Sequence, residues 1–230
     1  MRLTPRLQVI ADYVKKNSVV ADIGTDHGYI PVYLIKNSIC DKVIATDINK
    51  GPLENAKSYI KKHGLDDSID TRLGDGLRPV EPNEADTLII AGMGGLLIME
   101  ILEESKNVTE SIQNFILQPM VASDELRRYL YNNGYRIVDE KLAKESDKLY
   151  EIIYAKHGKE NFEKEIYFEI GKRLIENKDK NLPEFIRRKI EKLEKILNNL
   201  EDKDSTKGKR RYEELKNKYD DLKEVYNSIC

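Results

Sequence analysis

The residues best suited to chemistry in this chain are aspartates and glycines that follow short apolar segments. Four of them come in a fixed order: Asp22, Gly24, Asp47 and Asp75. A glycine at such a turn allows a positive φ and lets a ligand come close to the backbone. An ionised carboxylate accepts hydrogen bonds and offsets positive charge. The pattern therefore indicates a site for a small ligand that carries hydroxyl, amine or cationic groups.

The first of these residues belong to a glycine loop with the sequence D-I-G-T-D-H-G at residues 22–28. The loop lacks the middle glycine of the dinucleotide-binding pattern, because Asp26 occupies that position. The pyrophosphate of a dinucleotide would meet the Asp26 carboxylate, so a phosphate ligand is disfavoured. S-adenosylmethionine carries an ammonium, a carboxylate and a sulfonium but no phosphate. The acidic loop therefore favours S-adenosylmethionine as the ligand.

The two later aspartates have predicted contacts with different parts of that ligand. Asp47 lies 25 residues after Asp22, where an acidic residue accepts both ribose hydroxyls. Asp75, between Gly74 and Gly76, is placed to accept the exocyclic amine of adenine. A single acid at a strand end is commonly only a helix cap. The ordered set, at the carboxyl ends of successive strands, marks the crevice where open α/β sheets bind ligands.

Several residues near these loops allow two interpretations each. His27 and Tyr29 either face the ligand or cap and pack the helix that follows. Gly92-Met93-Gly94-Gly95 is either a tight turn or a place where a ligand approaches the backbone. Many nucleobase-amine methyltransferases carry Asn/Asp-Pro-Pro-Tyr/Phe at this point, and that motif is absent here. Gln118-Pro119-Met120 either lines the pocket or ends a strand.

A seven-stranded sheet with intervening helices is needed to bring these loops together. Short β-branched or alternating runs predict strands at 19–23, 42–47, 86–92, 114–118, 135–139 and 149–155, and a weaker run at 69–74 is placed as a strand by its position. Helices are predicted at 28–37, 52–63, 94–104 and 123–132, with Pro52 at a helix start and Ser123 as an N-cap. This alternation indicates a doubly wound parallel α/β sheet. The loop 140–148 is too short for a crossover helix, so the last two strands are expected to pair antiparallel at one edge.

The last part of the chain has the composition of long helices. Residues 1–157 hold 20 Lys and Arg against 24 Asp and Glu, whereas residues 158–230 hold 19 against 17. The second segment has one proline and three glycines, which favours helices over a mixed α/β domain. We therefore place a boundary near Gly158, between a catalytic domain at 1–157 and a helical extension at 158–230.

Two heptad patterns predict that the extension is an antiparallel coiled-coil hairpin. One apolar seam consists of Ile186, Ile190, Leu193, Leu197 and Leu200. The other consists of Tyr212, Leu215, Tyr219, Leu222 and Tyr226. A turn within 201–210 joins the two helices, and a further helix at about 162–176 connects the hairpin to the first domain.

Basic residues cluster at both ends of the expected hairpin. Those at its tip are Lys207, Lys209, Arg210 and Arg211, and those at its base are Arg187, Arg188 and Lys189. Clusters of this kind bind phosphates and position RNA without reading its sequence. The functional interpretation is a tRNA clamp, and the alternative is a solvated strut or a dimer arm.

The composition excludes several other classes of protein. The mean hydropathy is −0.60 and the longest uncharged runs have 13 residues, fewer than the about 20 that cross a bilayer. The N-terminus has no apolar segment of a secretion signal. Two cysteines and three histidines lie in no metal-ligand or disulfide spacing. We expect a cytoplasmic protein without membrane or metal partners. The sequence does not fix the oligomeric state, and a monomer is favoured.

Three motifs together are similar to one known family. D-I-G-T-D-H-G-Y-I-P at 22–31, A-G-M-G-G at 91–95 and L-Q-P-M at 117–120 resemble the bacterial tRNA adenine-N1 methyltransferases that modify position 22 of tRNA. The resemblance extends over the whole chain. It implies a Rossmann-like class I methyltransferase sheet that binds S-adenosylmethionine, with a helical C-terminal extension.

The resemblance also implies roles for individual residues. It implies cofactor contacts by Asp22, Gly24, Asp47, Asp75, Gly92 and Met93, to which we add their neighbours Thr25, Gly28, Ile48, Gly74 and Gly76. It implies that Asp26, His27 and Tyr29 face the target base. We expect Asp26 to stabilise the positive charge that develops on the base, and Tyr29 to stack on it. His27 is expected to hydrogen-bond either the base or the loop.

The chemistry expected of such an enzyme needs no general base. N1 of neutral adenine has a free lone pair, so the enzyme mainly aligns nucleophile, methyl group and sulfur. N1 lies on the Watson–Crick edge, so the base must be unpaired or flipped into the pocket.

Other function classes fit the sequence less well. A methyltransferase of the same fold acting on a small molecule or a protein is disfavoured by the basic hairpin. A nicotinamide-dependent enzyme is disfavoured by Asp26, and a non-catalytic RNA-binding module by the intact acid set.

Overall fold

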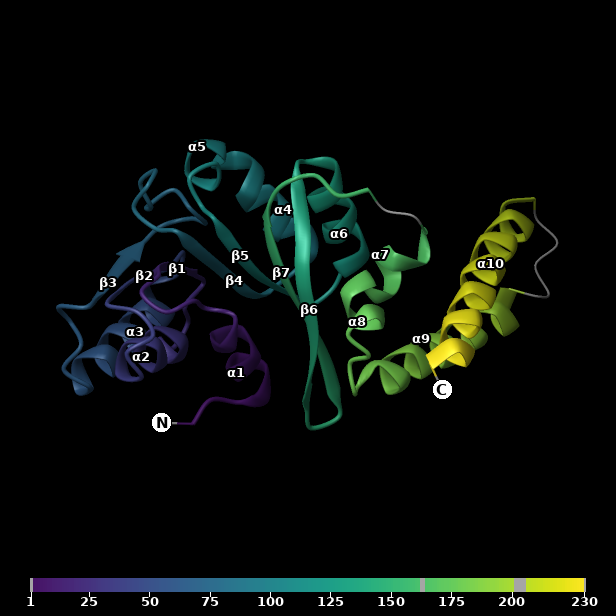
Figure 1. Ribbon diagram of the computed structural model, residues 1–230, viewed down its shortest axis with the longest axis horizontal. Helices are drawn as coiled ribbons and strands as arrows, with labels where there is room; N and C mark the ends of the chain where they lie inside the picture. Colours follow the sequence, from purple (N-terminus) through teal and green to yellow (C-terminus); the bar gives the residue numbers. More distant parts are fainter. Residues whose placement is uncertain (1, 162–163, 201–205, 230) are drawn as a thin grey trace. The chain divides into compact units, whose positions relative to one another are not determined.

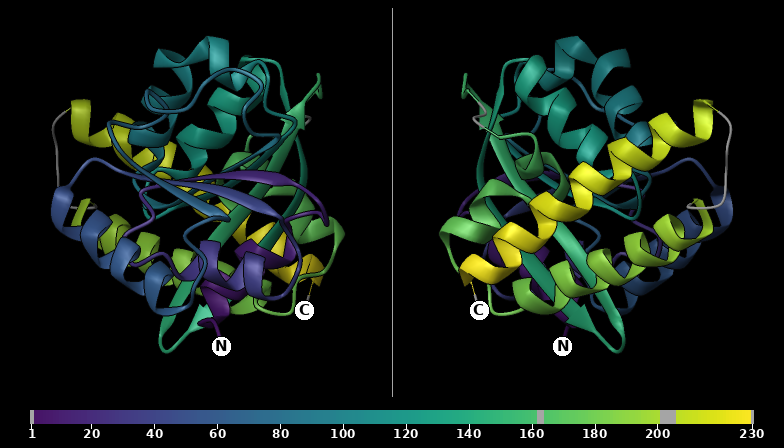
Figure 2. Two further views of the ribbon diagram at one scale, coloured as in Figure 1. Left: turned by 90° about the vertical axis from the view of Figure 1, so that its left-hand side faces the viewer. Right: turned by 90° about the vertical axis from the view of Figure 1, so that its right-hand side faces the viewer.

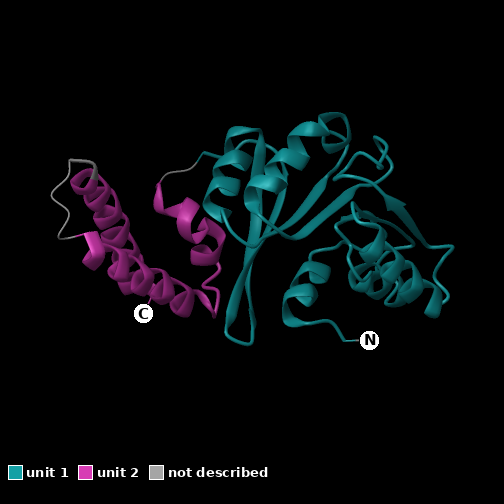
Figure 3. Cartoon of the chain, turned by 180° about the vertical axis from the view of Figure 1, so that it is seen from behind, with its two compact units in different colours: residues 1–161 teal, residues 162–230 magenta. Residues whose placement is uncertain are grey.

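The computed structural model describes residues 2–161, 164–200 and 206–229, with the side chains of 206 and 207 left out. The chain forms two compact units, residues 1–161 and 162–230 (Figure 3). The division therefore comes after residue 161, rather than after residue 157 as predicted from composition.

The first unit is built on one seven-stranded sheet (Figure 1). Its strands are β1 (Val19–Ile23), β2 (Lys42–Asp47), β3 (Ile69–Leu73), β4 (Thr87–Met93), β5 (Asn114–Pro119), β6 (Tyr135–Glu145) and β7 (Lys148–His157). Their order is β3-β2-β1-β4-β5-β7-β6, and β1 to β5 run parallel. β7 pairs antiparallel with both β5 and β6. The predicted sheet with an antiparallel edge hairpin is confirmed.

Helices cover both faces of this sheet (Figure 1). One face carries α1 (Pro5–Asp12), α2 (Tyr29–Lys36) and α3 (Lys50–Lys62), and the other carries α4 (Gly95–Glu104), α5 (Lys106–Thr109) and α6 (Ser123–Asn132). Alternate residues of the central strands supply the two apolar cores. In β4, for example, Ile89 packs toward α1–α3, while Leu88 and Ile90 pack toward α4–α6. Central strands buried on both faces read as continuous apolar runs, which is why the sequence predicts them so clearly.

Three local predictions need correction. Ser123 is the first residue of α6 and not its N-cap. Ala122, with φ 59°, takes the cap position, and the Ser123 hydroxyl donates to Glu151 Oε1 at 2.7 Å instead. α3 begins at Lys50, so Pro52 is its third residue, still in the first turn where a missing N–H costs no helical bond. The expected loop 140–148 is mostly strand, and only residues 146 and 147 separate β6 from β7.

A buried ion-pair network ties α6 to the edge hairpin. Arg127 of α6 is fully buried, and its guanidinium donates to Glu140 of β6 and Glu151 of β7, each at 2.7 Å. Removing one partner of such a network leaves a buried charge uncompensated, at a cost of about 3–5 kcal/mol. The network therefore fixes the hairpin, which is long enough to reach the carboxyl ends of the parallel strands.

The second unit is helical throughout its described part. It contains α7 (Ile166–Ile170), α8 (Lys172–Glu176), α9 (Leu182–Leu200) and α10 (Thr206–Ile229). α9 and α10 pack against each other and run in opposite directions (Figure 2). The helix expected at about 162–176 is two short helices instead. They are separated by Gly171, whose φ of 92° ends the first.

The apolar seams of the hairpin face inward as their spacing predicts. Ile186, Ile190, Leu193 and Leu197 are buried on α9, and Leu215 and Leu222 are buried on α10. A polar contact joins the same faces, since the Tyr219 hydroxyl donates to Glu194 Oε1 at 2.7 Å. Within the described residues, no helix is long and apolar enough to cross a bilayer.

Candidate active site

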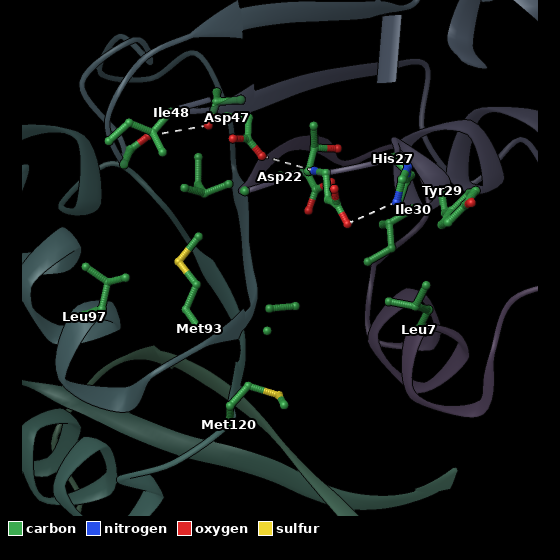
Figure 4. Close-up of a pocket in the computed structure, with 18 of the residues that line it drawn as sticks. Leu7, Asp22, His27, Tyr29, Ile30, Asp47, Ile48, Met93, Leu97 and Met120 are labelled. Carbon is green, nitrogen blue, oxygen red and sulfur yellow. Dashed lines mark hydrogen bonds and ion pairs between the residues drawn. The ribbon is translucent and has the colours of Figure 1, made fainter. Parts of the chain in front are cut away.

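A cavity of about 710 Å³ opens where the parallel strands of the first unit end. Its lining includes nearly all the predicted cofactor and base residues: Asp22, Gly24, Thr25, Asp26, His27, Tyr29, Asp47, Ile48, Gly74, Asp75, Gly76, Gly92 and Met93. Figure 4 shows Asp47 and Ile48 at one end of the cavity and Met120 at the other, with Leu7 of α1 across from Leu97. The parallel sheet therefore brings four separate loops to one site.

The β1–α2 loop depends on an unusual backbone. Gly24, Asp26 and Gly28 all have positive φ values, of 73°, 51° and 70°. The amides of Gly24 and Thr25 both donate to the Thr46 carbonyl of β2 at 2.9 Å, which holds the loop against the neighbouring strand. Gly28 lies outside the cavity lining. It is the N-cap of α2, and a Cβ there would lie 3.4 Å from Ala56 of α3.

The Met93 side chain packs against the backbone at Gly24. A Cβ on this residue would come within 2.4 Å of the Met93 methyl group, across the cavity floor between β1 and β4. The flexible Met93 side chain therefore packs directly against the Gly24 backbone, where only a glycine leaves it room.

Asp47 connects the two loops at the acidic end of the cavity. Its carboxylate accepts the Asn49 amide at 2.8 Å and the Asp26 amide at 3.3 Å. The residue is only 7% exposed, yet it lines the cavity. These two backbone donors hold the Asp47 carboxylate in a fixed direction.

Asp22 is the most deeply buried acid of the set, with 4% of its surface exposed. Burial raises the pKa of its carboxyl to about 6, the Thr25 hydroxyl acts in the opposite sense, and the nearby Asp47 charge raises it further. The carboxyl thus gains its proton near pH 6 in the free protein. A cation bound beside it would favour the ionised form.

Asp26, His27 and Tyr29 form a chain of contacts in the cavity lining, and Figure 4 shows His27 and Tyr29 side by side. Asp26 Oδ2 lies 3.5 Å from His27 Nε2, and the Asp26 side chain is 64% exposed. The His27 and Tyr29 rings lie 5.3 Å apart, and Tyr29 meets Tyr59 of α3 edge-on at 5.2 Å. These contacts allow both earlier interpretations, since the residues pack on helices and also face the cavity.

Sequence reasoning missed a second group of lining residues. They include Thr4, Arg6 and Leu7 before and within α1, Asn49 just before α3, Leu97 and Ile101 on α4, and Glu145 and Tyr150 from the edge hairpin. Arg6 Nη1 donates to Gln118 Oε1 at 2.7 Å, and the same oxygen accepts the Gly92 amide at 3.1 Å. Gln118 therefore supports the pocket, and Met120 lines it.

The predicted RNA-binding residues lie on the two long helices of the second unit. At the base of the hairpin, Arg187 pairs with Glu191 and Arg188 with Glu184, each at 2.6 Å, and Lys189 lies 3.6 Å from Glu169. Near the tip, Arg210 and Arg211 share Glu214, at 3.2 and 3.4 Å, and both are well exposed. Lys209 is exposed on the first turns of α10. The side chain of Lys207 lies outside the described residues.

Comparisons with known proteins agree with this geometry. A family model described as "Methyltransferase domain" matches residues 3–153. A Bacillus subtilis protein named tRNA (adenine(22)-N(1))-methyltransferase is 40% identical over 158 residues, which span 69% of this chain and 66%, just under two thirds, of that relative.

Two solved structures match over nearly the whole chain. The crystal structure of the B. subtilis m1A22 tRNA methyltransferase TrmK is 33% identical with a TM-score of 0.91, covering 98% of this chain and 99% of that one. M. capricolum TrmK, solved with S-adenosyl-homocysteine, is 29% identical with a TM-score of 0.86, covering 100% of both chains. This chain belongs to the tRNA (adenine(22)-N(1))-methyltransferase family.

Proposed function

We propose that the chain transfers the methyl group of S-adenosylmethionine to N1 of adenine 22 in tRNA. The observation that carries this proposal is the gathering of Asp22, Gly24, Asp47 and Asp75 around one cavity. The full-length similarity to proteins named for this activity supports it. The test is incubation of the full chain with bulk unmodified tRNA and methyl-labelled S-adenosylmethionine, with label expected in tRNA and in no protein fraction.

The chemistry of the lining fits S-adenosylmethionine. Bound there, this cofactor supplies a methyl group made electrophilic by the attached sulfonium. Asp47, held by two backbone amides, accepts the ribose hydroxyls. Asp75 accepts the adenine amine, and the buried Asp22 faces the cationic amino-acid end. Gly24 and Met93, which lie against each other, also line this cavity.

A dinucleotide fits this lining less well. Asp26 adopts a left-handed conformation in the loop, and its amide is already directed at the Asp47 carboxylate. Amides of such a loop bind a pyrophosphate only when they point at it. The loop therefore presents negative charge rather than free donors, which favours a cationic cofactor.

The residues that face the target base stabilise its positive charge and hold the base in position. Adenine N1 has its lone pair available, and the product N1-methyladenine is cationic. The Asp26 carboxylate in the cavity lining stabilises that charge as it develops. Tyr29 offers a half-exposed ring on which the flipped base stacks. His27 keeps Asp26 and Tyr29 in place through its contacts with both.

The second unit binds the phosphates of tRNA. The guanidinium groups of Arg210 and Arg211 share one carboxylate, whereas Arg187 and Arg188 each have a carboxylate of their own. Within residues 164–200 and 206–229, the two arginines near the tip thus pair with one carboxylate and the two at the base pair with two. We infer that the tip supplies more of the phosphate binding than the base does.

Asp47→Ala is expected to weaken S-adenosylmethionine binding by about 1.5–3 kcal/mol, the scale of hydrogen bonds to a charged group. The substitution removes the ribose acceptor and also releases two loop amides. Titration calorimetry measures the affinity, and Asp41→Ala serves as a matched control, because Asp41 is an exposed acid at the far end of β2. Equal affinity in the Asp47 variant and the wild type would remove Asp47 from the site.

The affinity for S-adenosylmethionine is expected to decrease as the pH is lowered from 7 to 5. The pKa of Asp22 is raised to about 6 by burial, so below that pH the carboxyl is neutral and must lose a proton to meet a cation. Linkage predicts a loss of up to about tenfold in affinity per pH unit below 6. Calorimetry across this range tests it. The Asp22→Asn variant should bind S-adenosylmethionine weakly at pH 7, and its affinity should not change between pH 7 and 5. If its affinity still changed steeply with pH, a group other than Asp22 would be the one that titrates.

A further inference from the structure

The end of the cavity farthest from Asp47 carries a different set of side chains. Figure 4 places Met120 at this end. Gln118 lies two residues earlier and contacts the Met120 sulfur through Nε2 at 3.5 Å, while its Oε1 accepts from Arg6. The Arg6 guanidinium in turn lies 5.3 Å from the centre of the Tyr150 ring. Tyr150, on β7, is therefore located at the end of the cavity away from the cofactor acids.

Glu145 lies next to Tyr150 on the same face of the edge hairpin. Antiparallel pairing sets Glu145 opposite Lys148 and Ala143 opposite Tyr150. Side chains two residues apart on a strand share a face, so Glu145 and Tyr150 are diagonal neighbours. Both line the cavity.

The Glu145 carboxylate is incompletely satisfied. Its Oε2 atom is buried, and no donor among the described residues reaches it. A buried acceptor without a donor costs about 1–3 kcal/mol, so a ligand donor that supplies the bond gains that much. Asp22, Asp47 and Asp75 are assigned to the cofactor and Asp26 to the charge on the base, which leaves Glu145 available to a further donor of the ligand.

We propose that Glu145 accepts a hydrogen bond from the exocyclic N6 amine of the target adenine, and that Tyr150 forms the wall beside that base. This inference rests on the proposed function, because it assigns the base-selecting group of the same site. Arg6 is a positioning residue, which holds Tyr150 through its guanidinium and the Gly92 turn through Gln118.

The assignment explains how a purine is chosen. Adenine presents an N6 donor beside N1, whereas guanine presents the O6 acceptor beside an N1 that already carries hydrogen. A carboxylate bonds the first and repels the second. Sites built to bond a polar group of their substrate reject analogues that lack it, because the protein group is then left unpaired.

The test compares two tRNA substrates that differ by one amine. One carries adenine and the other carries purine, which lacks N6 but keeps the N1 lone pair, at the target position. Single-turnover methylation rates are measured for the wild type, Glu145→Gln and Glu145→Met. The ratio of the adenine rate to the purine rate is compared across the proteins, so that the intrinsic difference in N1 reactivity cancels.

We expect Glu145→Met to lower this ratio by about 10- to 150-fold relative to the wild type, the range for a bond to a charged group. Glu145→Gln keeps a neutral acceptor and should retain an intermediate ratio. Affinity for S-adenosylmethionine should be unchanged in both. Asp147→Asn, in the exposed turn of the same hairpin, is the matched control and should keep the wild-type ratio.

The outcomes separate this inference from the proposed function. If the wild type methylates adenine at N1 but all variants share one ratio, Glu145 does not read N6, and the proposed function stands. If Glu145→Met lowers the affinity for S-adenosylmethionine as well as the ratio of the adenine rate to the purine rate, Glu145 acts on the cofactor and the inference is overturned. If the wild type does not methylate the adenine tRNA, the proposed function fails and the inference fails with it.

Discussion

Replacing Asp26 by Asn is expected to lower the single-turnover rate of methyl transfer to tRNA by about 10- to 1000-fold, the range found when one charge-stabilising group is removed from an active site. The substitution keeps the shape of the side chain and removes its charge. Asp26 has φ 51°, and Asn tolerates this left-handed conformation as well as Asp does, so the loop should keep its backbone. The loss of rate is then caused by the missing carboxylate charge beside the base, and not by a change in the loop backbone.

The rate must be measured at saturating S-adenosylmethionine, because Asp26 lies in the cofactor loop and its amide bonds Asp47. Calorimetry on the same variant separates cofactor binding from chemistry. Asp41→Asn, an exposed acid outside the cavity, is the matched control. An unchanged rate for Asp26→Asn at saturation would show that this carboxylate does not stabilise the cationic product.

Replacing Lys207, Lys209, Arg210 and Arg211 by Ser is expected to weaken tRNA binding and to flatten its dependence on salt. Each phosphate contact removed should lower the slope of log affinity against log salt by about one unit or less, which near 0.1 M salt corresponds to a loss of up to about tenfold per contact. Affinity for S-adenosylmethionine should be unchanged, because these residues belong to the second unit. Filter binding across a salt series measures both quantities.

A matched pair of substitutions at the base of the hairpin sharpens this test. Arg187 and Arg188 each face a carboxylate one helical turn away, so Arg187→Ser with Arg188→Ser should change the slope less per residue than the tip variant. Circular dichroism should show both variants folded. If the hairpin is only a strut, neither variant changes the affinity or the slope, and the clamp is excluded.

The core of the first unit follows from local sequence pattern. The strands β1, β2, β4 and β5 are buried on both faces, so each contains a short apolar run, whereas the edge strand β3 does not. The acids that follow β1, β2 and β3 fall on one edge by the geometry of parallel pairing. Asp22, Asp47 and Asp75 are therefore predictable as a set, although nothing in their spacing reveals that Asp47 binds the amide of Asp26. That bond depends on the left-handed turn of the loop.

The other half of the cavity depends on packing between distant segments. Arg6 reaches Gln118 and Tyr150 only because α1 packs on the edge hairpin, a contact between the first and the last elements of the sheet domain. Glu145 is predicted as loop because residues 140–148 are mainly charged or polar, although 140–145 belong to β6. Neither residue carries a motif that a single sequence would reveal.

In the second unit, periodicity predicts the long helices but not the breaks between short ones. The seams on α9 and α10 have regular spacing over several turns, which a helix requires. Gly171 divides the preceding helix because its φ of 92° is outside the helical region, and a lone glycine inside a helical pattern is compatible with either outcome.

The most direct test of methyl transfer to adenine N1 is to map the product on a single tRNA. The full chain is incubated with an unmodified transcript that carries adenine at position 22 and with methyl-labelled S-adenosylmethionine. The nucleosides are then separated, and the modified position is located by primer extension. We expect one label per tRNA, found in N1-methyladenosine at position 22, and none when guanine replaces that adenine. Label in another nucleoside or at another position, or no label on tRNA at all, would contradict the proposed function.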